Sequence, residues 1–315
     1  MRASRWWLAA AALWAALPAR AGAQACCTGT ASGELGVVGP CRRALVSAQL
    51  TWEHQVGGWA NDGTFRRFDG TRAEDLALTV AGGVRFLEDR LQLHGSLPVR
   101  MQHRALPGLG TSTRAGLGDA FVGLRGTIVE GAQDGVEKGD PSTLVPWVDL
   151  ILGAGIPTGR APDRTRDATG ADIMGDGSWD ATLGAKLTQF VASRHALTAT
   201  FTWSHRFARQ VEGRRFAPGA RYAVRLAWLH IPSLFWSWGP FASLDLTAPA
   251  EQDGNTVAAS RTRRLRVGLF ATHAIVFPTW ELMVGLSSDA MFDGGGRNVP
   301  FAGATLSVGI QRVFM

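Results

Sequence analysis

His195 to Phe207 reads HALTATFTWSHRF, a stretch in which large apolar residues alternate with small polar ones. Successive side chains of a β-strand point to opposite faces, so this alternation predicts a strand with one apolar and one polar face. A strand that spans a membrane needs roughly 9 to 11 residues, whereas strands in soluble proteins usually have about 5 or 6. The stretch therefore predicts a transmembrane β-strand.

The same period of two recurs in about twelve segments after residue 43. Strands in lipid must pair every backbone donor and acceptor, so they are stable there only as a closed barrel. The predicted strands are Ala44–His54, Glu74–Phe86, Leu91–His103, Gly116–Ile128, Leu144–Ile156, Ser178–Phe190, His195–Phe207, Arg221–Leu229, Leu234–Ala248, Arg264–Val276, Trp280–Asp289 and Ala302–Phe314.

The connections alternate in length. Those after odd strands are long and rich in Gly, Asp, Arg and Pro, whereas four of the even ones are tight: Leu87–Arg90, Val191–Arg194, His230–Ser233 and Phe277–Thr279. Only Val129–Thr143 breaks the rule. Bacterial outer-membrane barrels have short periplasmic turns and long extracellular loops. The chain is thus predicted to be an all-β, transmembrane antiparallel β-barrel with both ends of the barrel segment in the periplasm.

Tryptophan positions support this orientation, because indole rings prefer the headgroup level of a membrane. Trp52, Trp179 and Trp203 fall near the predicted extracellular rim. The periplasmic rim is predicted to hold Trp147, Trp228, Trp236, Trp238 and Trp280.

The N-terminus has the three parts of a signal peptide: Arg2 and Arg5, an apolar stretch from Trp6 to Pro18, and the small residues of an A-x-A site. The prediction is a signal peptide over 1–23, a periplasmic cysteine-bearing segment over 24–43 and a barrel over 44–315. Lipidation at Cys26 is the weaker alternative, because its site lacks the usual Leu. Export followed by barrel formation predicts the outer membrane of a Gram-negative bacterium.

The formal net charge of +6 falls to about +3 once Arg2, Arg5 and Arg20 leave with the signal peptide. This excess is too small to indicate nucleic-acid binding. After the signal peptide, no apolar stretch approaches the roughly 20 residues of a membrane helix.

Cys26, Cys27 and Cys41 are the only cysteines, and all precede the first strand. In an oxidising periplasm they predict one disulfide, most simply Cys27 to Cys41. A metal site would need more ligands than this segment supplies, because no histidine precedes His54. No metal and no cofactor are expected.

The polar phase of the strands predicts a charged, water-filled lumen. It contains Gln49, Glu53, Asp75, Arg85, Gln92, His94, Arg100, Gln102, Asp119, Arg125, Asp149, Asp180, Lys186, Arg206, Arg225, Asp245, Arg266 and Glu281. The mixed signs predict that many of these form cross-strand ion pairs and that some set selectivity. The selectivity candidates are Arg85, Arg100, Arg125, Arg206, Arg225 and Arg266, which would attract anions, together with Asp119, Asp149 and Asp180.

Catalysis is not expected. Ser204 and His205 are adjacent in the sequence, but neighbours in a strand point to opposite faces and cannot act as a nucleophile and its base.

Two charged segments are predicted at the extracellular side. The loop Pro157–Gly177 carries four aspartates and three arginines and is expected to contact lipopolysaccharide or to fold into the mouth of the barrel. The basic run Arg261, Arg263, Arg264 and Arg266 is expected to meet phosphate groups of the outer leaflet.

Three glycine-rich stretches carry a family resemblance. They are Gly116-Leu117-Gly118-Asp119-Ala120, Leu152-Gly153-Ala154-Gly155-Ile156-Pro157-Thr158-Gly159 and Gly175-Asp176-Gly177-Ser178-Trp179-Asp180. In that order they resemble the outer-membrane transporter family associated with meta-pathway phenol degradation, over roughly Ala115 to Phe207. The resemblance implies a porin-like β-barrel linked in some members to uptake of aromatic compounds, and it brings no catalytic residues.

Together these observations predict an outer-membrane channel or substrate-selective porin for passive uptake of small molecules, with aromatic or organic acids as candidate solutes. About twelve strands lie between the 8-strand barrels filled by side chains and the open 16-to-18-strand porins, so a narrow or loop-gated passage is expected. The alternative is a structural or adhesive outer-membrane barrel with a plugged lumen and with loops that bind a partner or lipopolysaccharide. The expected partners are outer-membrane lipid and lipopolysaccharide, the barrel-assembly machinery and a small solute, with no nucleic acid.

Overall fold

The computed structural model describes residues 35–38, 42–87, 90–131, 140–192, 194–233, 235–277 and 279–314. The predicted signal peptide and all three cysteines lie outside these residues. The signal peptide and the disulfide Cys27–Cys41 therefore stay predictions.

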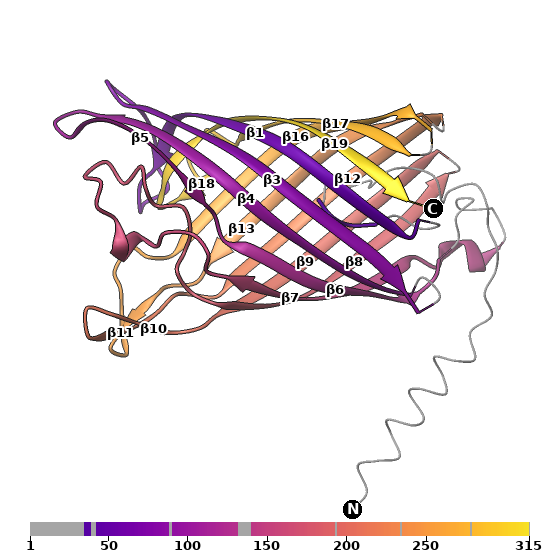
Figure 1. Ribbon diagram of the computed structural model, residues 1–315, viewed down its shortest axis with the longest axis horizontal. Helices are drawn as coiled ribbons and strands as arrows, with labels where there is room; N and C mark the ends of the chain where they lie inside the picture. Colours follow the sequence, from indigo (N-terminus) through magenta and orange to yellow (C-terminus); the bar gives the residue numbers. More distant parts are fainter. Residues whose placement is uncertain are drawn as a thin grey trace, which may run out of the picture.

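Twelve of the described strands close into an antiparallel β-barrel (Figure 1), which confirms the predicted fold. They are β1 (Ala44–Trp59), β3 (Arg72–Phe86), β4 (Leu91–Leu106), β6 (Ala120–Val129), β7 (Trp147–Ile156), β8 (Asp180–Ala192), β9 (His195–Arg206), β12 (Arg221–Ser233), β13 (Trp236–Thr247), β16 (Thr262–Val276), β17 (Trp280–Asp289) and β19 (Val299–Phe314). Each pairs with its neighbours in this order, and the pairing of β1 with β19 from Ala44↔Phe314 onward closes the wall.

The two ends of the barrel differ. At one end, called here the long-loop end, the connections contain further short strands: β2 (Phe65–Arg67), β5 (Gly110–Leu117), β10 (Arg209–Val211), β11 (Arg214–Ala217), β14 (Glu251–Gln252), β15 (Asn255–Thr256) and β18 (Gly296–Arg297), besides the 3-10 helix η3 (Pro162–Arg164). At the other, the short-turn end, β8, β12 and β16 pass into the next strand through turns of two or three residues. Both ends of the described barrel, Ala44 and Phe314, lie there.

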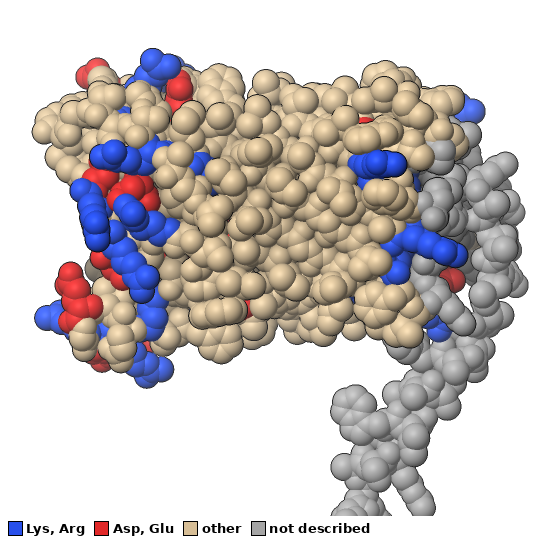
Figure 2. Space-filling model, in the orientation of Figure 1, with Lys and Arg blue, Asp and Glu red and all other residues tan. Residues whose placement is uncertain are grey.

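Side chains alternate between the two faces as predicted. In β9, Leu197 and Phe201 are 50% and 47% exposed, while Ala196 and Thr198 are buried in the interior. Figure 2 shows the consequence: a broad uncharged band covers the middle of the visible face, and charged side chains gather at the two ends. A separate finding is that no helix among the described residues is long and apolar enough to span a membrane.

Several strand ends differ by a few residues from the prediction, such as that of β1, which continues to Trp59, and three segments differ in kind. His230–Ser233 is not a turn, because β12 continues through a bulge to Ser233. Leu144 does not begin a strand but ends the 3-10 helix η2 (Pro141–Leu144). The long loop expected after the third strand is a hairpin, in which β4 and β5 pair as far as Leu106↔Gly110.

The predicted fourth strand, Gly116–Ile128, is interrupted. Ser96 pairs with Phe121 and Val99 with Leu117, so β5 and β6 carry one more residue than β4 between these pairs. This is a β-bulge at Gly118 and Asp119. It lies beside Pro98, which has no N–H to donate to the ladder and whose carbonyl accepts the Gly118 N–H at 2.8 Å.

One predicted interfacial tryptophan faces inward. Trp147 packs against a buried apolar cluster inside the barrel, whereas Trp236, Trp238 and Trp280 are exposed on its outside. Its position two residues before the inward-facing Asp149 explains this orientation.

Candidate solute pathway through the barrel

The predicted selectivity residues lie on the inner wall, with one exception. On the strands they alternate with outward-facing apolar side chains, as Arg100 does between Val99 and Met101. The residues placed in this way are Arg85 on β3, Arg100 on β4, Arg125 on β6, Asp149 on β7, Asp180 on β8, Arg206 on β9, Arg225 on β12 and Arg266 on β16. The exception is Asp119, which sits at the bulge between β5 and β6.

Arg125 and Asp149 form an ion pair across β6 and β7. The Arg125 Nη2 atom lies 2.5 Å and its Nε atom 3.1 Å from Oδ2 of Asp149. The Thr127 hydroxyl donates to the other carboxylate oxygen at 2.7 Å, and Lys186 lies directly across from Asp149 on β8. Both groups are therefore engaged in bracing the wall.

A second network of ion pairs lies on β1, β16 and β17, and only two of its members, Glu53 and Arg266, were predicted to face the lumen. Arg264 donates to both carboxylate oxygens of Asp289, at 2.6 and 2.7 Å, and to Glu53 at 2.5 Å. Arg266 lies 3.5 Å from the same Asp289 carboxylate. The prediction that the whole basic run meets lipid phosphates is thus wrong for Arg264 and Arg266, which face the lumen. Their same-parity spacing on one strand was the signal that could have shown it.

A third network joins β1, β3 and β4. Arg104 forms an ion pair with Asp75 at 2.6 Å, Gln55 donates to the same carboxylate at 3.0 Å, and the Arg104 guanidinium lies 4.6 Å from the Phe301 ring centroid. Arg104 was missed because it was placed in a loop.

Arg100 is the most available of the predicted cations. Its side chain is exposed to the lumen and donates one long hydrogen bond of 3.5 Å to the carbonyl of Met174. It forms no salt bridge within the described part of the chain. By contrast, the Arg225 guanidinium lies over the Phe241 ring, 4.2 Å from its centroid.

The three glycine-rich stretches meet at Asp119. One Asp119 oxygen accepts the Gly159 N–H at 3.0 Å, and the other accepts the Asp176 N–H at 2.6 Å. The Thr158 hydroxyl bridges the two sides of the bulge. It accepts the Ala120 N–H at 3.0 Å and donates to the Gly118 carbonyl at 2.5 Å.

Glycine at position 175 is required by this close approach. A Cβ atom there would lie 2.1 Å from an Asp119 oxygen, a distance too short for any residue that has a side chain. The spacing of the three stretches thus follows from one structural junction between the wall and the loop 157–177.

The loop 157–177 folds against the inner wall. Gln102 donates to the Ile173 carbonyl at 2.9 Å, and the buried Met174 side chain lies over Gly116. Part of this predicted extracellular loop therefore narrows the long-loop end of the lumen.

Hydrogen bonds keep the loop carboxylates ionised. Burial alone would raise the pKa of Asp172, but the Thr165 hydroxyl, the Arg166 N–H and the Arg160 guanidinium lower it to about 2. Hydrogen bonds from Ser112 and Thr169, and then from Arg114, hold the pKa of Asp167 well below its usual range.

Beside the loop, the mouth of the barrel contains a pocket of about 540 Å³. Arg206 and Arg221 both approach Asp176, and Arg209 pairs with Asp163 at 2.6 Å. The other lining includes Phe216, Val211, Pro218, Thr247 and Thr262. The pocket thus combines three cations with an aromatic and aliphatic surface.

At the short-turn end, the segment that precedes β1 narrows the lumen. The Gly36 carbonyl accepts a hydrogen bond from Gln92 at 3.0 Å, and Val38 is 1% exposed, so residues 36–38 lie inside the barrel against β3 and β4. Arg42 is buried and forms an ion pair with Glu281.

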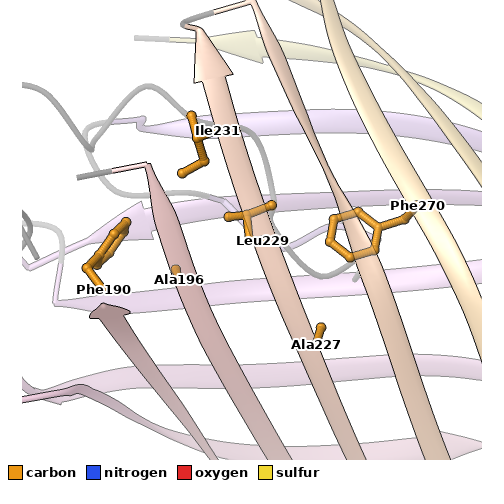
Figure 3. Close-up of a cluster of buried hydrophobic side chains, with 6 residues drawn as sticks. All are labelled: Phe190, Ala196, Ala227, Leu229, Ile231 and Phe270. Atoms are coloured by element: carbon orange, nitrogen blue, oxygen red, sulfur yellow. The ribbon is translucent and has the colours of Figure 1, made fainter. Parts of the chain in front are cut away.

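Apolar side chains line the wall at this end. The cluster in Figure 3 contains Phe190, Ala196, Ala227, Leu229, Ile231 and Phe270. The interior thus has charged groups at the mouth and, at the short-turn end, both this apolar cluster and the buried Arg42–Glu281 pair.

No protein-family model matches the sequence, and no curated protein matches it significantly. Solved structures do. The crystal structure of an outer membrane channel from Pseudomonas putida F1 superposes with a TM-score of 0.69 at 16% identity, covering 90% of this chain and 98% of that one. The translocator domain of the autotransporter NalP from Neisseria meningitidis has a TM-score of 0.50 at 12% identity, covering 86% and 88%. At these identities the similarity establishes the outer-membrane β-barrel fold.

Proposed function

We propose that this protein is an outer-membrane channel for passive uptake of small organic anions. The observation that carries the proposal is the 540 Å³ pocket at the mouth, where Arg206, Arg209 and Arg221 outnumber Asp163 and Asp176. The lining has one positive charge in excess, and such an excess raises the local concentration of anions and their rate of entry.

Aromatic acids are the proposed solutes. The Phe216 ring and the aliphatic Val211 and Pro218 in the same pocket offer an apolar surface beside the guanidinium groups. The resemblance of Ala115 to Phe207 to the family associated with phenol degradation supports the same class. The structural similarity to a Pseudomonas putida channel is consistent with transport.

Transport is tested by planar-bilayer recording with a salt gradient. A weakly anion-selective conductance is expected, with benzoate carrying more current than an aliphatic carboxylate of similar size and with a neutral sugar failing to block it. A cation-selective wild-type channel would contradict the proposed solute class.

The competing proposal is a structural or adhesive barrel with a closed lumen. The specific observation in its favour is the burial of Val38 and Arg42 inside the short-turn end, where Arg42 pairs with Glu281. A wild-type barrel that is folded but carries no current would favour this alternative.

The membrane setting belongs to the same proposal. The long-loop end would face the cell exterior, since bacterial barrels have long extracellular loops and short periplasmic turns. Lipopolysaccharide and the barrel-assembly machinery are the proposed partners. Phe314 at the end of β19 is the proposed recognition element for assembly. Its ring faces outward, and its centroid lies 5.1 Å from the Arg312 guanidinium.

A further inference from the structure

A second pocket lies between the edge of β5 and the loop 157–177. Its volume is about 820 Å³, and its lining includes Arg114–Leu117 on one side and Arg160, Arg164 and Arg166 on the other. β5 pairs only with β4, so its other edge has no strand partner among the described residues and faces this pocket.

The pocket has an excess of positive charge. Its two carboxylates are already engaged: Asp167 by Arg114 at 3.0 Å and by Ser112, and Asp172 by Arg160 at 2.6 Å and by Thr165. Arg164 and Arg166 are exposed and form no salt bridge with a described residue. Two guanidinium groups therefore remain available to an anion.

The pocket also touches the lipid-facing surface. Leu117 faces outward from β5 and is 47% exposed, in line with the apolar residues of the membrane band. In Figure 2, interleaved basic and acidic side chains at the long-loop end begin where the uncharged band stops. A ligand here would place an anionic group among the arginines and an apolar part along the outer wall.

We propose that this pocket binds the phosphate groups of lipopolysaccharide in the outer leaflet. The inference rests on the proposed outer-membrane location and on the long-loop end facing the exterior. Arginine suits this ligand, because its planar guanidinium group donates two parallel hydrogen bonds to a phosphate. The acyl chains of the same molecule would pack against Ala115 and Leu117.

The test compares the double variant Arg164→Gln/Arg166→Gln with the control Arg214→Gln/Arg215→Gln. The control removes the same charge from exposed residues at the same end of the barrel, outside the pocket. The full-length protein in lipopolysaccharide-free phosphatidylcholine nanodiscs is titrated with purified lipopolysaccharide. The pocket variant should bind about tenfold more weakly or worse, because each hydrogen bond to a charged group is worth about a factor of ten, and the control should bind like the wild type.

Two further ligands identify the binding group. Dephosphorylated lipopolysaccharide should bind the wild type as weakly as it binds the pocket variant. Inorganic phosphate should compete only at concentrations far above those of the lipid; equal affinity would mean that the pocket takes free phosphate and would overturn the lipid assignment.

Equal lipopolysaccharide binding by the wild type and the pocket variant would refute the inference, provided that both show the same heat-modifiable gel mobility. Conductance in lipopolysaccharide-free bilayers keeps this result apart from the channel proposal. The pocket variant should conduct like the wild type, and a wild type that does not conduct would remove the channel proposal while leaving the binding result standing.

Discussion

The Asp119 carboxylate accepts the backbone N–H of Gly159 at 3.0 Å, although 40 residues separate the two in the sequence. This contact joins the bulge in the wall to the start of the loop 157–177, and the Asp176 N–H bound to the other oxygen joins its end. One carboxylate therefore fixes both ends of the loop that narrows the lumen.

Asp119→Asn should loosen this loop and raise single-channel conductance and current noise. An amide has one acceptor oxygen, so its NH₂ group would face one of the two N–H donors, and a hydrogen bond to a charged group is worth about 1.5 to 3 kcal/mol. The matched control is Asp253→Asn, because Asp253 accepts a single backbone N–H at 2.8 Å in an exposed turn. Unchanged conductance and noise in Asp119→Asn would show that another contact holds the loop.

The loop should also loosen in acid. The pKa of Asp172 is lowered to about 2 from the ordinary value of 3.8. A carboxyl group with a lowered pKa in the folded state stabilises that state above its unfolded pKa, and this contribution is lost as the pH falls through the folded value. A spin label at the exposed position 168 should therefore become more mobile between about pH 4 and pH 2.

The variant Asp172→Asn should show the mobile spectrum of this label already at neutral pH. A label at position 255, in the separate β14–β15 hairpin, serves as the control, and its mobility should not change in this pH range. A loop label whose mobility stays constant down to pH 2 would contradict the role of Asp172.

The strands were predictable because their signal is local. Each barrel strand shows period-two alternation in its own sequence, and β9 occupies His195–Arg206 where His195–Phe207 was predicted. The interruption at Gly118 and Asp119 was not predictable in this way. It depends on Pro98 in the neighbouring strand, and the alternation within the fourth strand does not record its partner.

The candidate site was predictable in composition but not in arrangement. Alternation placed Arg125 and Asp149 on one face, and the structure joins them. It could not show that Asp119 serves the loop, because its partner Asp176 is 57 residues away and is bound through its backbone N–H rather than its side chain. A hydrogen bond to a backbone N–H does not depend on the type of the residue that donates it, so the sequence does not reveal the donor.

Arginine substitutions should separate the two faces of β8. Leu187→Arg places a charge on the lipid face near the middle of the strand, where the cost is about 2 to 4 kcal/mol, because Leu187 is 46% exposed to the outside. Thr182→Arg points into the lumen near Asp180 and should be tolerated. The assembled fraction, measured by heat-modifiable gel mobility, should fall only for Leu187→Arg, and equal losses would contradict the assignment of faces.

Surface labelling should reveal the orientation of the barrel. In a background with Cys26, Cys27 and Cys41 replaced by Ser, a cysteine at Arg214 in the β10–β11 hairpin should react with an impermeant reagent on intact cells. A cysteine at Arg194, in the tight turn between β8 and β9, should react only after the outer membrane is opened. The reverse pattern would place the long-loop end in the periplasm.

Arg100→Gln should lower the anion preference of the channel more than Arg125→Gln does. Arg100 is exposed to the lumen with only a 3.5 Å hydrogen bond to a carbonyl, so its charge acts on passing ions. The charge of Arg125 is offset by Asp149 at 2.5 Å, and its loss should instead lower thermal stability. Asp149 would keep the Thr127 hydrogen bond and the facing Lys186, so the loss should stay below the roughly 3 to 5 kcal/mol of a fully uncompensated buried charge. Reversal potentials under a salt gradient and melting curves of the same two variants separate these effects, because selectivity should shift in one and stability in the other. If Arg100→Gln kept the wild-type reversal potential while Arg125→Gln changed it, the fixed charge that selects the ion would lie at β6 and not at β4.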